Sequence, residues 1–200
     1  MGAEPPFAKV SRIFVFSLLL ACGSTQAASA ADVGAEGLTR IFIDACIPNM
    51  GELEKVRLWA QQQHLTEIQN QPALNVFVGS GTEGAAWAVP TGAGNFALAI
   101  RGKTQGCVVF GQKADPAEAQ AYFRKLVEGA KKPGLNIKVE KDETSATPAG
   151  VAHMLAYDIW AESAPKGFVF LMMTVEHPNA AFQAWFEVAR SSAPSAASAP

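Results

Sequence analysis

The sequence predicts an α+β domain in which two N-terminal helices precede an antiparallel sheet with the element order β-β-α-β-β-β-α. Three stretches support this prediction. Residues 87–110 alternate like two strands joined by a turn, residues 115–134 have the cap and spacing of an amphipathic helix, and residues 137–175 contain three strand-like runs. One antiparallel sheet with helices on one side is the natural packing for this order.

The first part of the chain, residues 1–30, is predicted to be a signal peptide. Two basic residues precede the apolar run 13–21, which is too short to span a bilayer as a stable helix. Two cleavage sites compete. Ala-Ser-Ala at 28–30 fits a signal peptidase, whereas Leu-Leu-Ala before Cys22 resembles a lipobox, in which Cys22 would be lipidated and anchor the protein to the outer membrane. Both alternatives place the mature domain in the periplasm.

Composition divides the rest of the chain into three parts. Residues 31–37 are expected to be a linker, residues 38–190 a single α+β domain, and the Ser/Ala/Pro-rich residues 191–200 a disordered tail. About 160 residues suit one domain with a sizeable core.

Two helices are expected at the start of the domain. Thr39 can cap the first helix, whose apolar positions share one face, and Pro48 ends it. Asn49 followed by Glu52 indicates a new cap, and the second helix is expected to run to about Gln63.

A loop-like region at 70–86 separates these helices from the sheet. It contains one short strand, expected at 74–78, and the glycine-rich segment 79–84. Trp87 follows this segment. A tryptophan there can cover a ligand, but more often its ring packs at the edge of the hydrophobic core. If the chain has a binding surface here, Trp87, Arg101 and Lys103 are its candidate residues.

The central hairpin has two unlike strands. Phe96, Leu98 and Ile100 alternate with alanines, which predicts one bulky face and one thin alanine face of the kind that often lies under a helix. The run 107–110 is apolar throughout and is expected to be an inner strand. Residues 101–106 form the turn between them.

The helix that follows has the clearest start in the chain. Asp115 provides an N-cap, Pro116 occupies the first helical position and Glu118 completes the capping pattern. The segment 131–134, Lys-Lys-Pro-Gly, ends the helix with cations where the helix dipole favours them.

Three strands and a final helix complete the prediction. Residues 137–141 alternate with charges and predict an edge strand, residues 151–160 a second strand, and the apolar run 168–175 a central strand. Pro178 and Asn179 are expected to open a helix, which would place Phe182, Trp185, Phe186 and Ala189 on one face.

Two cysteines remain in the mature domain, Cys46 and Cys107. An even number of cysteines in an oxidising compartment favours one disulfide, which would attach the first helices to the sheet. The alternatives are a catalytic cysteine, which needs a nearby base, and two buried thiols. No local signature marks such a base.

No constellation of residues points to catalysis, a cofactor or a metal. The three histidines are scattered, and none has metal-ligand spacing with a cysteine. His153 and Asp158 differ by an odd number, so one strand would present them on opposite faces. The net charge of −2, without a basic stripe, argues against a nucleic-acid partner.

Four short segments carry a family resemblance: Phe-Ile-Asp-Ala-Cys at 42–46, Trp-Ala-Val-Pro at 87–90, Phe96 through Cys107-Val-Val, and Phe-Gln-Ala at 182–184. Over residues 38–190 the chain resembles an uncharacterised family of small exported proteobacterial (lipo)proteins. The resemblance implies a pairing of Cys46 with Cys107 and transfers no catalytic residue. The element order also resembles the profilin-like or longin-like sandwich, an analogy of fold that carries no function.

These observations predict a non-enzymatic periplasmic binding or interaction protein, such as an immunity or inhibitor protein, with a protein partner in the envelope. Two alternatives remain. One is an accessory lipoprotein of an outer-membrane or secretion complex, and the other is an unrecognised envelope hydrolase or thiol enzyme.

Overall fold

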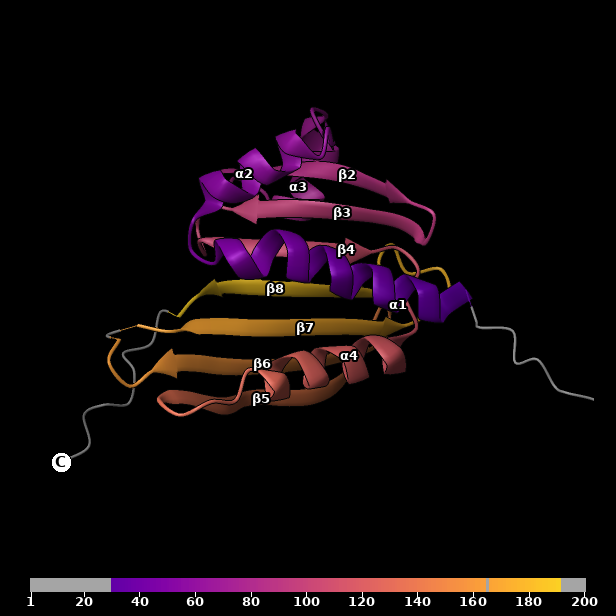
Figure 1. The fold of residues 1–200 in the computed structure, drawn as a ribbon. Coiled ribbons are helices and arrows are strands. Elements are labelled where there is room, and N and C mark those ends of the chain that lie inside the picture. Colours follow the sequence, from indigo (N-terminus) through magenta and orange to yellow (C-terminus); the bar gives the residue numbers. More distant parts are fainter. Residues whose placement is uncertain (1–29, 165, 192–200) are drawn as a thin grey trace, which may run out of the picture.

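A computed structural model describes residues 30–164 and 166–191 and has one eight-stranded antiparallel sheet with four α-helices (Figure 1). The predicted α+β class with an antiparallel sheet is confirmed. In chain order the elements are α1 (Ala30–Ile41), the π-helical turn η1 (Phe42–Cys46), the 3-10 turn η2 (Ile47–Asn49), α2 (Leu53–Gln62), β1 (Thr66–Glu67), α3 (Gln71–Val78), β2 (Gly84–Thr91), β3 (Gly94–Arg101), β4 (Gly106–Gly111), α4 (Pro116–Gly129), β5 (Leu135–Thr147), β6 (Gly150–Ala161), β7 (Phe168–Glu176) and β8 (Ala184–Arg190).

The sheet consists of two meanders joined through the last strand. Its order is β1-β2-β3-β4-β8-β7-β6-β5, so β8 lies between β4 and β7. Phe110 of β4 is opposite Trp185 of β8, which in turn is opposite Met173 of β7. Both halves therefore belong to one continuous hydrogen-bonded sheet.

The main core lies between the sheet and the helices α1, α2 and α4, which cover its front in Figure 1. Phe42 from η1, Phe123 from α4 and Phe186 from β8 are fully buried there. The ring of Phe186 is 5.7 Å from that of Phe42 and 5.0 Å from that of Phe123. Burial of these rings helps to attach the helices to the sheet.

A second, smaller core lies behind the sheet, where α3 packs on β2 and β3. The buried side chains there include Ala97 and Ala99, and Phe77 of α3 contacts Phe110 with ring centroids 5.3 Å apart. The thin alanine face expected in the hairpin thus does lie under a helix. Small side chains are needed here because α3 must approach the sheet closely.

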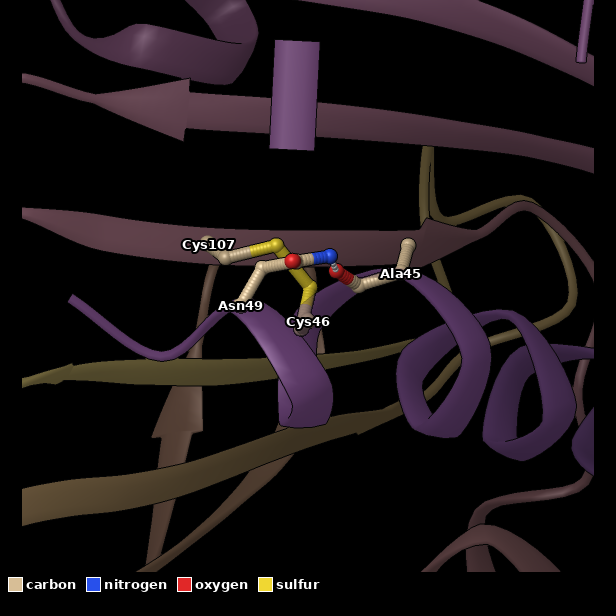
Figure 2. Close-up of a disulfide and its surroundings, with 4 residues drawn as sticks. All are labelled: Ala45, Cys46, Asn49 and Cys107. Atoms are coloured by element: carbon tan, nitrogen blue, oxygen red, sulfur yellow. Dashed lines mark hydrogen bonds between the residues drawn. A yellow bond between two sulfur atoms is a disulfide. The ribbon is translucent and has the colours of Figure 1, made fainter. Parts of the chain in front are cut away.

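A disulfide joins Cys46, at the end of η1, to Cys107, at the start of β4 (Figure 2). The two Cα atoms are 5.5 Å apart and are separated by 61 residues in the chain. Both residues belong to the main core. The bond attaches the N-terminal helical segment to the middle of the sheet, which agrees with the disulfide predicted from the two remaining cysteines.

The N-terminal helices differ from the prediction in their boundaries. Residues 31–37, expected to be a linker, lie within α1. Thr39 is not a cap, because its hydroxyl donates to the carbonyl of Ala35 inside the helix (2.8 Å). Asn49 does not cap the next helix either. Its side-chain amide donates to the carbonyl of Ala45 (2.9 Å, Figure 2), and α2 begins at Leu53.

The strand expected at 74–78 is wrong, because these residues form α3. Asn70 caps this helix by accepting a hydrogen bond from the Ala73 amide (3.1 Å), and Pro72 occupies its first turn. A proline there loses no helical hydrogen bond.

The final helix expected from Pro178 is also wrong, because residues 184–190 form β8. The aromatic residues of this segment fit a helical face, but they fit strand alternation equally well. The sheet decides between the two, since β8 bonds to β4 on one side and β7 on the other. Without β8 both strands would have an unpaired edge. The element order therefore differs from β-β-α-β-β-β-α, and the profilin-like or longin-like order does not apply.

The other predicted elements are present. Asp115 caps α4 by accepting from the Glu118 amide (2.9 Å), with Pro116 in the first turn. β5 is the edge strand, and β7 is an inner strand. Ser191, expected to begin a disordered tail, is buried, and its amide donates to the carbonyl of Gly167 (3.0 Å). The predicted signal peptide, with Cys22, lies outside the described residues except for Ala30.

Candidate functional site

The candidate site is the back of β5–β8, where no helix among the described residues packs against the sheet. α1 and α4 cover the front of this half, and α3 covers only the back of the other half (Figure 1). We call this surface the open face. Strand register places these side chains on it: Met154, Ala156 and Asp158 of β6, Val169, Leu171 and Met173 of β7, and Trp185, Glu187 and Ala189 of β8.

The centre of the open face is apolar. Met154, Met173 and Trp185 form one cross-strand row, and Trp185 continues it towards the α3 side by contacting Phe110, with ring centroids 6.1 Å apart. Leu171 lies in the next row. Of these residues Met154, Leu171, Met173 and Trp185 are only partly buried. The described chain thus leaves apolar side chains from three adjacent strands accessible to solvent.

Asp158 is the carboxylate of the open face that forms no ion pair in the described structure. It is 9% exposed, and its Oδ1 atom has no hydrogen-bond partner in the described structure. Lys138 of β5 is directly opposite, but its ammonium pairs with Glu140 at 2.9 Å. A buried carboxylate oxygen without a donor is costly, which makes this position unusual among the described residues.

Glu187 is the second carboxylate of the open face, and it is paired. Its Oε2 lies 2.7 Å from Nη1 of Arg101, and its Oε1 accepts from the Thr104 hydroxyl (3.4 Å). Burial raises the pKa of Glu187, although Arg101 and Thr104 oppose this shift. Gly106 makes the pair fit, because a Cβ there would lie 2.7 Å from the carboxylate.

Arg101 also joins this site to α3. Its Nε donates to the carbonyl of Phe77 in the last turn of that helix (2.9 Å), where a cation is favourable. Its guanidinium lies over the ring of Phe110, 5.6 Å from the centroid. Three interactions thus hold Arg101 in place at the border of the open face.

A cleft of about 560 Å³ opens beside this pair. Arg101, Lys103 and Thr104 line it from the β3–β4 turn, Val169 and Leu171 from β7, and Glu187 from β8. Two of the three residues predicted for a binding surface, Arg101 and Lys103, therefore meet here. Glu187 was missed by sequence reasoning because it was assigned to a helix.

Trp87, the third predicted residue, does not lie on this surface. It is 2% exposed and belongs to the main core on the opposite face of the sheet. Arg57 of α2 covers it, 5.7 Å from the ring centroid. The interpretation of Trp87 as a core residue is the one that the structure supports, because its strand turns this side chain towards the helices.

Other titratable groups gather on the front. Asp142 of β5 pairs with Arg124 of α4 (2.8 Å) and with Nε2 of His153 (2.7 Å). Hydrogen bonds from Arg124 and then His153 lower the pKa of Asp142. His153 and Asp158 lie on opposite faces of β6, as expected. No group of three or more His, Cys, Asp or Glu side chains in residues 30–164 and 166–191 is placed to hold a metal ion.

The comparisons with known proteins find no match among protein-family models, curated proteins or solved structures. Of the helices in the described part of the chain, none is long and apolar enough to span a membrane.

Proposed function

We propose that this chain is a non-enzymatic binding protein of the bacterial envelope and that it holds a protein partner on its open face. One observation carries the proposal. Partly exposed apolar side chains from three strands lie to one side of a nearly buried carboxylate, Asp158, on a face that no described helix covers. Contiguous apolar surface of this kind marks interaction sites.

The composition of the face favours a protein over a small molecule. Methionine and tryptophan are enriched at protein interfaces, where the flexible thioether adapts to the partner's shape. Met154, Met173 and Trp185 form such a row on a sheet face. A partner that buries this row would also remove Leu171 from water.

The carboxylates define the chemistry expected of the partner. Asp158, which is 9% exposed, forms no ion pair among the described residues, and a lysine or arginine of the partner would pair with its carboxylate. Glu187 already has Arg101 and needs no second cation. We therefore expect an apolar patch on the partner with one basic residue beside it, on the side that would face β5.

This proposal suits an immunity or inhibitor protein, and it suits an accessory lipoprotein of an envelope complex through the same face. Export to the periplasm and lipidation of Cys22 remain predictions from the N-terminal sequence. No cofactor is part of the proposal.

Site-specific photo-crosslinking in intact cells tests it. A crosslinking amino acid is placed at Leu171 or Met173 on the open face, and at Val76 of α3 or Leu58 of α2 as controls, which are 59% and 54% exposed. We expect one heterologous protein product from the open-face positions alone, reduced by Asp158→Asn. Crosslinks only between copies of this chain, or equal products from the control positions, would refute the proposal.

A further inference from the structure

A second concave site lies on the front of the molecule, away from the open face. It is an apolar pocket of about 510 Å³ between the C-terminal end of α4, η2 and the β6–β7 connection. Its lining includes Met50, Leu126, Ile159, Phe168 and Phe170, which come from four separate parts of the chain. We call it the α4 pocket. Its size falls within the range of ordinary small-molecule sites.

The charged residues that line the α4 pocket are all cationic. Lys131, Lys132 and Lys166 are among its lining residues, and no lining residue is acidic. None of the three forms an ion pair within the described part of the chain. An apolar interior with a cationic edge complements a molecule that has an apolar body and an anionic end.

Helix stabilisation explains only part of this arrangement. Lys131 and Lys132 directly follow α4, where cations interact favourably with the helix dipole. Lys166 belongs to the β6–β7 connection and has no such reason to lie at this helix end. Two unrelated segments thus bring cations to the same opening.

We propose that the α4 pocket binds a fatty acid anion, with the hydrocarbon chain among the apolar side chains and the carboxylate at the three lysines. A single chain with a compact anionic head matches both the apolar lining and the positive edge. This inference does not depend on the proposed function, because the α4 pocket and the open face lie on opposite sides of the sheet.

Calorimetric titration of the purified protein with sodium laurate below its micelle concentration tests the inference. We expect saturable binding of one laurate per chain, with the stoichiometry checked by native mass spectrometry. Dodecanol and dodecylamine have the same chain with a neutral or cationic head, and we expect each to bind at least about tenfold more weakly because the charge-assisted contacts are lost.

Two pairs of variants locate the site. The triple change K131Q/K132Q/K166Q should weaken laurate binding about tenfold or more, whereas K55Q/K113Q/K125Q removes the same charge elsewhere and should not. Ala130→Trp, in the lining, should block the pocket, whereas Ala121→Trp, on the exposed side of α4, should leave binding unchanged.

Three results would overturn the inference: no saturable laurate binding, equal affinity for dodecanol, or equal losses in the rim and control variants. Binding of the wild type to phosphatidylglycerol vesicles without binding to free laurate would also overturn it, and would assign the three lysines to a membrane surface instead.

Discussion

Removing the link between Cys46 and Cys107 should destabilise the domain by about 4 kcal/mol. The bond closes a loop of 61 residues, and in the chain-entropy model a loop of that length restricts the unfolded chain by about this amount. For a domain of this size such a loss lowers the thermal midpoint by about 10 °C. This estimate assumes that the contacts between η1 and the sheet are unchanged, so the whole loss comes from the greater conformational entropy of the unfolded chain.

Urea unfolding of the oxidised and reduced protein measures this loss directly, because reduction breaks the link and removes no heavy atom. The variant C46A/C107A should lose somewhat more, since deleting two buried sulfurs leaves small cavities. Reductant should have no effect on this variant, which is the control for other actions of the reagent. A loss below about 1 kcal/mol on reduction would refute the argument, because it would mean that the unfolded chain is not restricted by the bond.

Four further predictions concern charges and packing. Arg101→Met should cost about 3 kcal/mol in urea unfolding because it leaves Glu187 buried without its cation, and R101M/E187M should recover part of that loss. The pKa of Glu187 is raised in the folded protein, so protonation of this group favours folding. Its contribution to the free energy of unfolding is fully present below the ordinary pKa of a glutamate and is lost as the pH rises through the folded-state pKa. Glu187→Gln should therefore flatten this part of the curve of unfolding free energy against pH. Asp142 has a lowered pKa in the folded protein, so its contribution to the free energy of unfolding is present above the ordinary pKa of an aspartate and is lost as the pH falls through the folded-state pKa. Asp142→Asn should remove this loss at acid pH and should cost about 0.5 kcal/mol at neutral pH. Phe123→Ala should cost about 3–5 kcal/mol, whereas no measurable loss would mean that α4 does not need this ring to stay on the sheet.

The sequence predicted correctly those elements whose start depends on a few neighbouring residues. Asp115 and Pro116 start α4 through a cap and a preset backbone angle, both of which are visible within four residues. Asn70 and Pro72 have nearly the same pattern before α3, so a stricter use of the capping rule would have found that helix. The alternation around Ala97 likewise predicted a covered face without showing which helix covers it.

β8 was not predictable in the same way, because its conformation depends on strands far away in the sequence. The spacing of Trp185 and Phe186 fits a helix or a strand, and only the free edges of β4 and β7 select the strand. The same error hid part of the candidate site. Arg101 and Lys103 were visible as charges on a turn, but Arg101 and Glu187 are 86 residues apart and meet only when β8 is in place.

The position of β8 also has a consequence for how this chain folds. Its two meanders, β1–β4 and β5–β7, share no direct strand pairing, and the strand that bridges them is the last one in the described chain. As the chain folds, each half can form its own hairpins early, but the sheet becomes continuous only after Ala184–Arg190 has paired. Such long-range pairing is slow, and until it occurs the edges of β4 and β7 are open to other chains. The interval before β8 docks is therefore when this protein is most exposed to aggregation and to proteases.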